Sequence, residues 1–313
     1  MELESDISLF EYHRPVMLET CLDWLNIHKD GVYVDATFGG GGHSRGILER
    51  LGENGKLYAF DRDADALSNT IDDPRFCLIN ENFKFLKNFL RLHGVRQING
   101  LIADLGISSH QIDTAERGFS TRMDGPLDLR MDRREGITAA DLVNSATEEE
   151  LQRIFRFYGE LGNARQLARS ICTARKEQSI TTTAQLCASV GKHLPRGREN
   201  KTLAMIFQAL RIEINGELEA LKQMLEQATE ILVPGGRMCI MSYHSLEDRL
   251  VKNFMKSGNF EGEIKKDFYG NVLSPLRMVS RGHISATEDE LQLNNRARSA
   301  KLRVAEKKDG ETE

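Results

Sequence analysis

A chain of 313 residues can form one large domain or two ordinary ones, and its 40% hydrophobic and 28% charged residues are typical of a soluble globular protein. The net charge of −5 argues against a protein that binds nucleic acid over its whole surface, although a local basic face remains compatible with RNA. No apolar run reaches the length of a membrane span, and the first six residues include three acids and lack the apolar core of a signal peptide, so we expect a cytoplasmic protein with no membrane partner.

The five cysteines are odd in number, widely spaced and free of any Cys-x-x-Cys pair, which argues against a disulfide framework and against a zinc site. His43 and His244 also lack partners at metal-ligand spacing. We therefore expect no bound metal.

The first predicted elements are a short helix over 18–25 and a strand that begins at Val32. This strand runs through β-branched and aromatic residues to Asp35, and four glycines at 39–42 and a helical pattern follow it. A strand, a glycine turn and a helix open a nucleotide-binding βαβ unit, because glycine lets the backbone approach a ligand and the helix start offers free N–H groups. The sequence thus predicts an α/β, Rossmann-like fold.

The residues around this turn favour a cationic ligand. A G-x-G-x-x-G pattern does not fit, because its last glycine would fall on Ser44 or Arg45, and His43 stands where the chain would approach a pyrophosphate. Asp35 precedes the turn, and a carboxylate repels pyrophosphate but attracts an ammonium or sulfonium group. The turn therefore fits S-adenosylmethionine better than NAD; a glycine-rich turn without a ligand is the alternative.

The second strand, 56–63, is apolar until it ends in acids. Asp61 follows the glycine turn by roughly the 20 residues expected for an acid that hydrogen-bonds a ribose hydroxyl. Alternatively, Asp61 only caps a helix predicted over 64–70.

Two further strands are predicted at 75–80 and 98–104. Phe83 lies just beyond the first of them, where an aromatic ring could pack on adenine or could equally belong to the core. The second ends in Asp104 and leads into a loop with glycine and serine.

From 112 to 201 the strand pattern stops and helical patterns follow a charged, irregular stretch. We expect a helical domain over 112–201 inserted into a sheet-containing domain formed by 1–111 and 202–313. The insert is rich in arginine, and Arg165 and Arg169 share one helix face. This face is either a solvated helix surface or a surface that contacts RNA phosphates.

After the insert, a helical stripe runs from Leu203 to Leu221, and a turn is predicted at 233–236. A strand over 237–241 precedes His244, and a helix is expected over 249–255. The last strands, at 276–279 and 302–305, have weaker patterns.

Polar residues at four strand ends should converge on one edge of a parallel sheet; they are Asp35, Asp61, Asp104 and His244. Methyl transfer to an exocyclic amine needs alignment, exclusion of water and a hydrogen-bond acceptor for the amine proton. Asp104 or the carbonyls of the following loop could be this acceptor, and Asp104 could equally hold the amino group of the cofactor.

Several motifs then resemble a known family; they are Thr37–Ser44 (TFGGGGHS), Phe60–Asp63 (FDRD), Asp104–Ser109 (DLGISS), Glu116–Ser120 (ERGFS), Gly125–Asp132 (GPLDLRMD) and Ser242–Arg249 (SYHSLEDR). Together they resemble the bacterial 16S ribosomal RNA N4-cytosine methyltransferases, the small-subunit methyltransferase H family. The resemblance spans nearly the whole chain. It implies a class I S-adenosylmethionine-dependent methyltransferase fold with an inserted helical domain, and as acceptor a cytidine in the decoding region of 16S rRNA in the small ribosomal subunit.

The resemblance also assigns residues. The cofactor contacts of the family fall on Gly41, Gly42, His43, Asp61, Phe83, Asp104 and Gln111. From the charge argument we add Asp35 to the cofactor site. We expect Asp104 to be catalytic and substrate to contact Ser108, Ser109 and His244, and a homodimer is compatible with the sequence.

Two other classes of protein remain open from the residues alone. The first is a nicotinamide-dependent dehydrogenase, which the poor glycine match and Asp35 disfavour. The second is a non-catalytic RNA-binding assembly factor that keeps a nucleotide-binding fold.

Overall fold

The computed structural model describes residues 15–309, so the acidic N-terminal segment lies outside the described residues. Its chain forms two compact units. The first contains the residues up to Gly106 and those from Glu219 onwards, and the second contains Ile107–Leu218.

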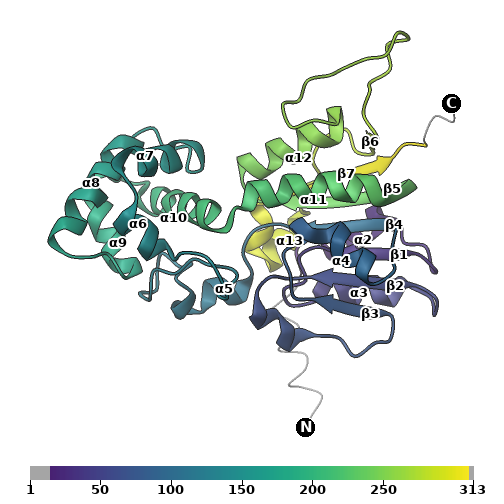
Figure 1. Cartoon of the computed structure of the whole chain (residues 1–313), viewed down its shortest axis with the longest axis horizontal. Coiled ribbons are helices and arrows are strands. Elements are labelled where there is room, and N and C mark those ends of the chain that lie inside the picture. Colours follow the sequence, from purple (N-terminus) through teal and green to yellow (C-terminus); the bar gives the residue numbers. More distant parts are fainter. Residues whose placement is uncertain (1–14, 310–313) are drawn as a thin grey trace. The chain divides into compact units, whose positions relative to one another are not determined.

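A seven-stranded sheet forms the centre of the first unit (Figure 1). Its strands are β1 (Val32–Asp35), β2 (Lys56–Phe60), β3 (Phe76–Ile79), β4 (Ile98–Asp104), β5 (Leu232–Ser242), β6 (Leu276–Met278) and β7 (Lys301–Lys307). They lie in the order β3-β2-β1-β4-β5-β7-β6. All pairs of neighbouring strands from β1 to β5 are parallel, whereas β7 is antiparallel to both β5 and β6.

Helices cover both faces of this sheet. They are α2 (Leu18–Leu25), α3 (Gly42–Arg50), α4 (Leu86–Leu92), α11 (Glu217–Ile231), α12 (Ser245–Ser257) and α13 (Glu288–Leu293), with 3-10 turns η1 (Ala64–Asn69), η2 (Phe83–Phe85) and η5 (Asn295–Ser299). Successive strand residues point to opposite faces, so Val34 packs in a core with α4, α11 and α12. Its neighbour Tyr33 packs in another core with α2 and α3.

The second unit is built from helices around a core of its own. Its elements are α5 (Ser109–Asp113), η3 (Ala115–Arg117), α6 (Ala139–Ser145), α7 (Glu148–Phe157), α8 (Ala164–Glu177), α9 (Thr183–Val190), η4 (Gly191–His193) and α10 (Glu199–Asn215). No strand occurs over residues 105–231, all of which the structure describes. The unit extends beyond the predicted range 112–201, because Ile206, Phe207 and Leu210 of α10 are buried in its core.

Local details differ from the predictions. The helical stripe from Leu203 to Leu221 is two helices, since Gly216 ends α10 with a φ of +58°. The helix predicted over 64–70 is the 3-10 turn η1. The turn predicted at 233–236 lies inside β5, where the pairing with β4 shifts register. The helix predicted from residue 249 begins at Ser245, because His244 caps it.

Among the described residues, no helix is both long enough and apolar enough to pass through a lipid bilayer.

Gly46 sets the distance between α2 and α3. A Cβ atom at this position would lie 2.6 Å from Leu22 Cδ1 and 3.1 Å from Leu18 Cδ1. We expect Gly46→Val to lower the free energy of unfolding by about 1–3 kcal/mol through overpacking, measured by urea denaturation. Gly282→Val is the control, since a Cβ there meets no atom within 4 Å; its effect should stay within about 0.5 kcal/mol. Equal stability of both variants would contradict this account of the packing.

Candidate active site

The carboxyl ends of four parallel strands lie along one edge of the sheet. Asp35 and Asp104 are the last residues of β1 and β4, Asp61 follows β2, and Tyr243 follows β5. Asp104 pairs with Met241 near the end of β5, whereas Asp35 pairs with Ile102, so β1 ends two residues before β4 at this edge. The charge of Asp35 adds to the rise in pKa of both Asp61 and Asp104, after the larger contribution of burial, so the three carboxyl groups interact.

The glycine turn leaves its backbone open at this edge. A Cβ atom at Gly39 or Gly40 would meet nothing within 4 Å. By contrast, a Cβ at Gly42 would lie 2.0 Å from Pro15 Cγ, and one at Gly41 would lie 2.9 Å from the Phe38 ring. The first two glycines thus expose the backbone, while the last two let α3 start against neighbouring side chains.

Side chains hold this turn in place. Gly39 has a φ of +51°, its N–H donates to Asp61 Oδ2 at 2.7 Å, and its carbonyl accepts from the Asn69 amide at 3.0 Å. Arg45 donates to the Gly40 carbonyl at 2.9 Å. The other oxygen of Asp61 accepts from the Asp63 N–H at 2.9 Å. Because each carboxylate oxygen has two lone-pair sites, Asp61 keeps capacity for a further donor such as a ribose hydroxyl.

Asp35 and His43 fix the start of α3. Asp35 is 1% exposed and accepts hydrogen bonds from Ser44 Oγ at 2.7 Å and from the Thr37 N–H at 3.0 Å. Burial raises its pKa, and an electrostatic interaction with the nearby His43 side chain opposes this rise. His43 Nε2 lies 3.1 Å from the Val16 carbonyl, to which it donates in the matching tautomer. The two side chains therefore have structural partners at the predicted cofactor site.

Asp104 is held from two sides. Its N–H donates to Thr37 Oγ1 at 2.6 Å, and its Oδ1 accepts from the Tyr243 hydroxyl at 2.5 Å. Burial raises the pKa of Asp104 to about 6, while burial and the Asp104 charge raise that of Tyr243, which remains a donor. Asp104 Oδ2 accepts no hydrogen bond from any residue that the structure describes, so this oxygen is available to a ligand.

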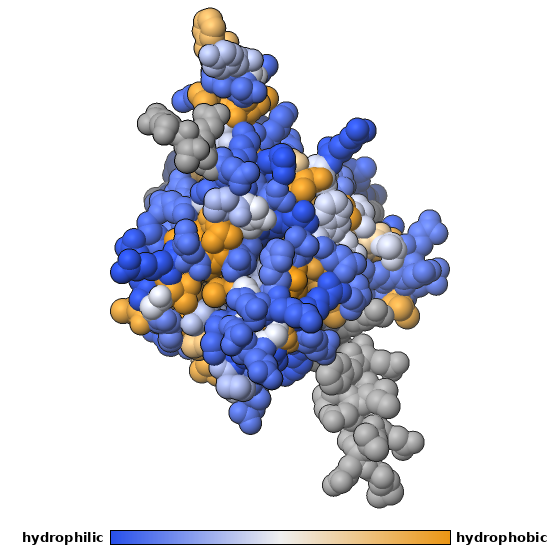
Figure 2. Space-filling model, turned by 90° about the vertical axis from the view of Figure 1, so that its right-hand side faces the viewer, coloured by the Kyte–Doolittle hydropathy of each residue, from blue (hydrophilic) through white to orange (hydrophobic). Residues whose placement is uncertain are grey.

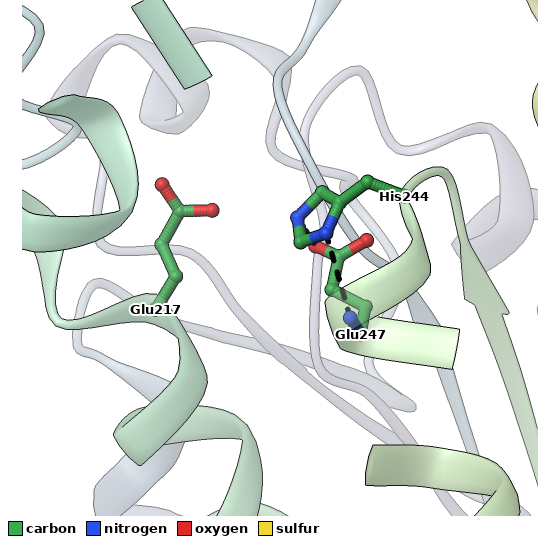
Figure 3. A group of neighbouring side chains, drawn as sticks. All are labelled: Glu217, His244 and Glu247. Carbon is green, nitrogen blue, oxygen red and sulfur yellow. Dashed lines mark hydrogen bonds and ion pairs between the residues drawn. The ribbon is translucent and has the colours of Figure 1, made fainter. Parts of the chain in front are cut away.

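His244, which follows Tyr243 in the chain, caps α12, and Figure 3 shows it next to Glu247. Its Nδ1 accepts from the Glu247 N–H at 3.4 Å, and its Nε2 lies 3.1 Å from Glu247 Oε1. Glu247 Oε2 in turn accepts from the Tyr243 N–H at 3.1 Å, so the cap also positions the tyrosine backbone. Glu217, also drawn in Figure 3, belongs to the second unit, where it pairs with Arg211 at 2.8 Å.

The remaining predicted residues lie in different places. Phe83 begins η2 and is partly buried against the core of the first unit. Gln111, Ser108 and Ser109 belong to the second unit. There Ser108 and Gln111 form a capping box at the start of α5, with bonds of 3.2 Å and 3.1 Å. The cofactor and substrate roles of these residues stay predictions.

Three site residues were missed by the sequence analysis. Tyr243 directly follows a strand, as the predicted acids do, so its position in the sequence could have indicated that it belongs to the site. Thr37 and Asn69 act through single hydrogen bonds to Asp104 and Gly39; Thr37 begins the quoted motif Thr37–Ser44, whereas no local pattern marks Asn69.

The raised pKa values of Asp61 and Asp104 predict how stability depends on pH. A native pKa of about 6, against an ordinary 3.8, means that the native state holds a proton more tightly than the unfolded chain. This contribution to stability is fully present below about pH 4 and is lost as the pH rises through about 6. We expect Asp104→Asn to lose less stability than the wild type as the pH rises from about 4.5 to about 6.5, in urea unfolding at each pH.

Asp73→Asn is the control for this experiment. Its partner Arg75 lowers the pKa of Asp73 to about 2, so its titration lies below the pH range measured. Identical pH dependence of the wild type and the Asp104→Asn variant would show that Asp104 does not titrate in this range.

The chain is similar to known proteins over nearly its whole length. The ribosomal RNA small subunit methyltransferase H of Flavobacterium johnsoniae is 56% identical over 95% of this chain and 98% of its own length. The protein of the same name from Bacteroides thetaiotaomicron is 55% identical over the same shares. The predicted class I, Rossmann-like α/β fold with helices between β4 and β5 is confirmed. Residues 11–308 match the model of the MraW methylase family, and the chain therefore belongs to that family.

Proposed function

We propose that this chain transfers a methyl group from S-adenosylmethionine to N4 of a cytidine in the decoding region of 16S rRNA, within the small ribosomal subunit. Family membership and the names of the two relatives support a methyltransferase acting on small-subunit rRNA. The resemblance of the motifs supports the N4 atom and the decoding region. The observation that carries the proposal is the edge where Asp35, Asp61 and Asp104 meet the open glycine turn.

The residues at this edge fit S-adenosylmethionine. The open positions at Gly39 and Gly40 allow a ligand to approach the backbone, and three interacting carboxyl groups create a negative field that suits a sulfonium and an ammonium group. The backbone of the turn from Gly39 to Gly42 and the Asp61 side chain would hold the cofactor. When bound, it supplies an activated methyl group, so the protein itself must align the acceptor and exclude water.

Asp104 is the acceptor for the proton of the cytosine amine. The lone pair of an exocyclic amine is delocalised into the ring, and a hydrogen bond from the amine to a carboxylate makes that pair more available. The Tyr243 hydroxyl donates to Asp104 Oδ1, and Thr37 Oγ1 accepts from the Asp104 N–H. These two hydrogen bonds fix the position of Asp104 Oδ2. A pKa of about 6 keeps Asp104 mostly ionised at neutral pH, as an acceptor must be.

We expect Asp104→Ala to lower the rate of methyl transfer by about 10²–10⁴-fold, because it removes this acceptor. The assay follows labelled methyl from S-adenosylmethionine into small subunits, with mass spectrometry of the nucleosides to identify N4-methylcytidine. The wild-type rate should fall below about pH 6, where Asp104 becomes protonated.

Asp72→Ala removes an exposed acid of the same unit and is the matched control, with full activity expected. Full activity of Asp104→Ala would refute the role given to Asp104. RNA from a strain that lacks the protein should lack the modification, and its persistence would refute the proposed substrate.

The segment from 163 to 204 of the second unit is the proposed RNA-binding surface. It carries eight lysines and arginines against two glutamates, in a chain whose net charge is −5. Arg165 and Arg169 are exposed on one face of α8, and neither forms an ion pair with a described residue. Cations that lack protein partners are available to neutralise phosphates, which supports a surface that contacts RNA.

The double variant Arg165→Glu/Arg169→Glu should bind small-subunit RNA at least tenfold more weakly. It should also reduce the slope of log Kd against log salt concentration by about 1.5, because two phosphate contacts are lost. Fluorescence anisotropy at several salt concentrations gives both quantities, and binding of S-adenosylmethionine should not change.

Arg91→Glu/Arg96→Glu makes the same change of charge at exposed positions of the first unit and is the control. An equal loss of affinity in both double variants would mean that only net charge matters, and the proposed surface would be wrong.

A further inference from the structure

The segment 263–273, which connects α12 to β6, projects from the first unit (Figure 1). We call it the aromatic arm. Its tip carries Phe268 and Tyr269, which are 98% and 86% exposed, with ring centroids 5.7 Å apart in an edge-to-face arrangement. Figure 2 shows hydrophobic atoms at the end of the projection at the top of the molecule, above hydrophilic ones. Exposing two rings in this way leaves a large apolar surface in water.

Hydrogen bonds make the tip an ordered turn. The Asp267 N–H donates to the Asn271 carbonyl at 2.9 Å, and the Asn271 N–H donates to Asp267 Oδ1 at 2.8 Å. Gly270 adopts a φ of +89°, which this turn requires, and its N–H donates to the Asp267 carbonyl. The two aromatic residues therefore occupy the outermost positions of a closed loop.

The base of the aromatic arm is attached on both sides. Asn259 accepts from the Gly262 and Glu263 N–H groups at 2.8 Å and 3.0 Å. On the other side, Lys308 Nζ donates to the Val272 carbonyl at 2.9 Å. Because the arm is ordered before any partner binds, little conformational entropy is lost when its rings make contacts.

Cations lie next to the rings. Lys265 and Lys266 are exposed, and neither forms an ion pair with a residue that the structure describes. The neighbouring acid, Asp267, has its carboxylate engaged by Asn271. The arm thus combines two exposed ring faces with two available positive charges.

We propose that the aromatic arm binds unpaired nucleotides of the substrate RNA, with Phe268 and Tyr269 stacking on bases and Lys265 and Lys266 contacting adjacent phosphates. Aromatic rings beside lysines are the usual means of binding single-stranded nucleic acid. A protein partner fits less well, because two rings of about 150–250 Å² each offer much less than the roughly 800 Å² that each side of a standard protein interface buries. The identity of the RNA rests on the proposed function, whereas the stacking itself does not.

The test compares the full chain with Phe268→Ala/Tyr269→Ala, using a fluorescein-labelled single-stranded RNA and a duplex of the same sequence. We expect the variant to bind the single strand about tenfold or more weakly, with a smaller change for the duplex. Leu92→Ala/Leu293→Ala removes two other exposed apolar side chains of this unit, 79% and 72% exposed, and should leave binding unchanged. Unchanged affinity of the arm variant for the single strand would overturn the proposal.

The Phe268→Trp variant gives a second measurement that does not depend on activity. Its affinity should match the wild type, and single-stranded RNA should quench its added fluorescence by stacking; the wild type, whose single tryptophan is Trp24, sets the baseline. No quenching would overturn the proposal.

Other occupants give other results. Loss of binding to intact small subunits with unchanged binding to free RNA would indicate a ribosomal protein, and a lower mass in sedimentation would indicate a second copy of this chain; either result overturns the proposal. If the wild type transfers no methyl group while the arm variant still binds RNA weakly, the proposed function fails and the arm proposal stands.

Discussion

The hydrogen bond between the Gly39 N–H and Asp61 joins the turn after β1 to the end of β2, and the proposed site depends on it. The same peptide unit is held on its carbonyl side by Asn69. Gly39 and Gly41 both have a positive φ, and without these hydrogen bonds the turn could adopt other conformations, because glycine restricts φ and ψ less than any other residue. Because the turn is shaped before a ligand arrives, binding does not have to order it.

The position of the acids has a cost for stability. Burial raises the pKa of Asp35, Asp61 and Asp104, so each carboxyl group is harder to ionise in the folded chain than in water. Asp35 and Asp61 recover part of this cost by accepting hydrogen bonds, but Asp104 keeps one oxygen without a partner among the described residues. Such groups are typical of functional sites, where a ligand completes the interactions that the fold leaves open.

Membership of a methylase family decides against the nicotinamide-dependent dehydrogenase that the glycine turn alone left open. A non-catalytic RNA-binding factor would use the basic segment of the second unit and the aromatic arm in the same way. It would have no use for an ionised Asp104 positioned by Tyr243 and Thr37. The arrangement around Asp104 is therefore what separates a catalyst from a binding protein in the proposed function.

The central elements and the acids at their ends could be predicted from the local sequence alone. Runs such as Val32–Asp35 and Ile98–Asp104 are local patterns, and parallel strands bring their carboxyl ends to one edge whatever the rest of the chain does. The side chains that meet at this edge could not be predicted in the same way, because their contacts depend on the folded arrangement of the whole sheet. Tyr243 and Asp104 are 139 positions apart and Asn69 and Gly39 are 30 apart, so their hydrogen bonds form only once the sheet is assembled. The end of α10 at Gly216 could not be predicted either, because the helical pattern of apolar residues continues past this glycine. The exposure of Phe268 was also unexpected, because large aromatic residues are usually buried.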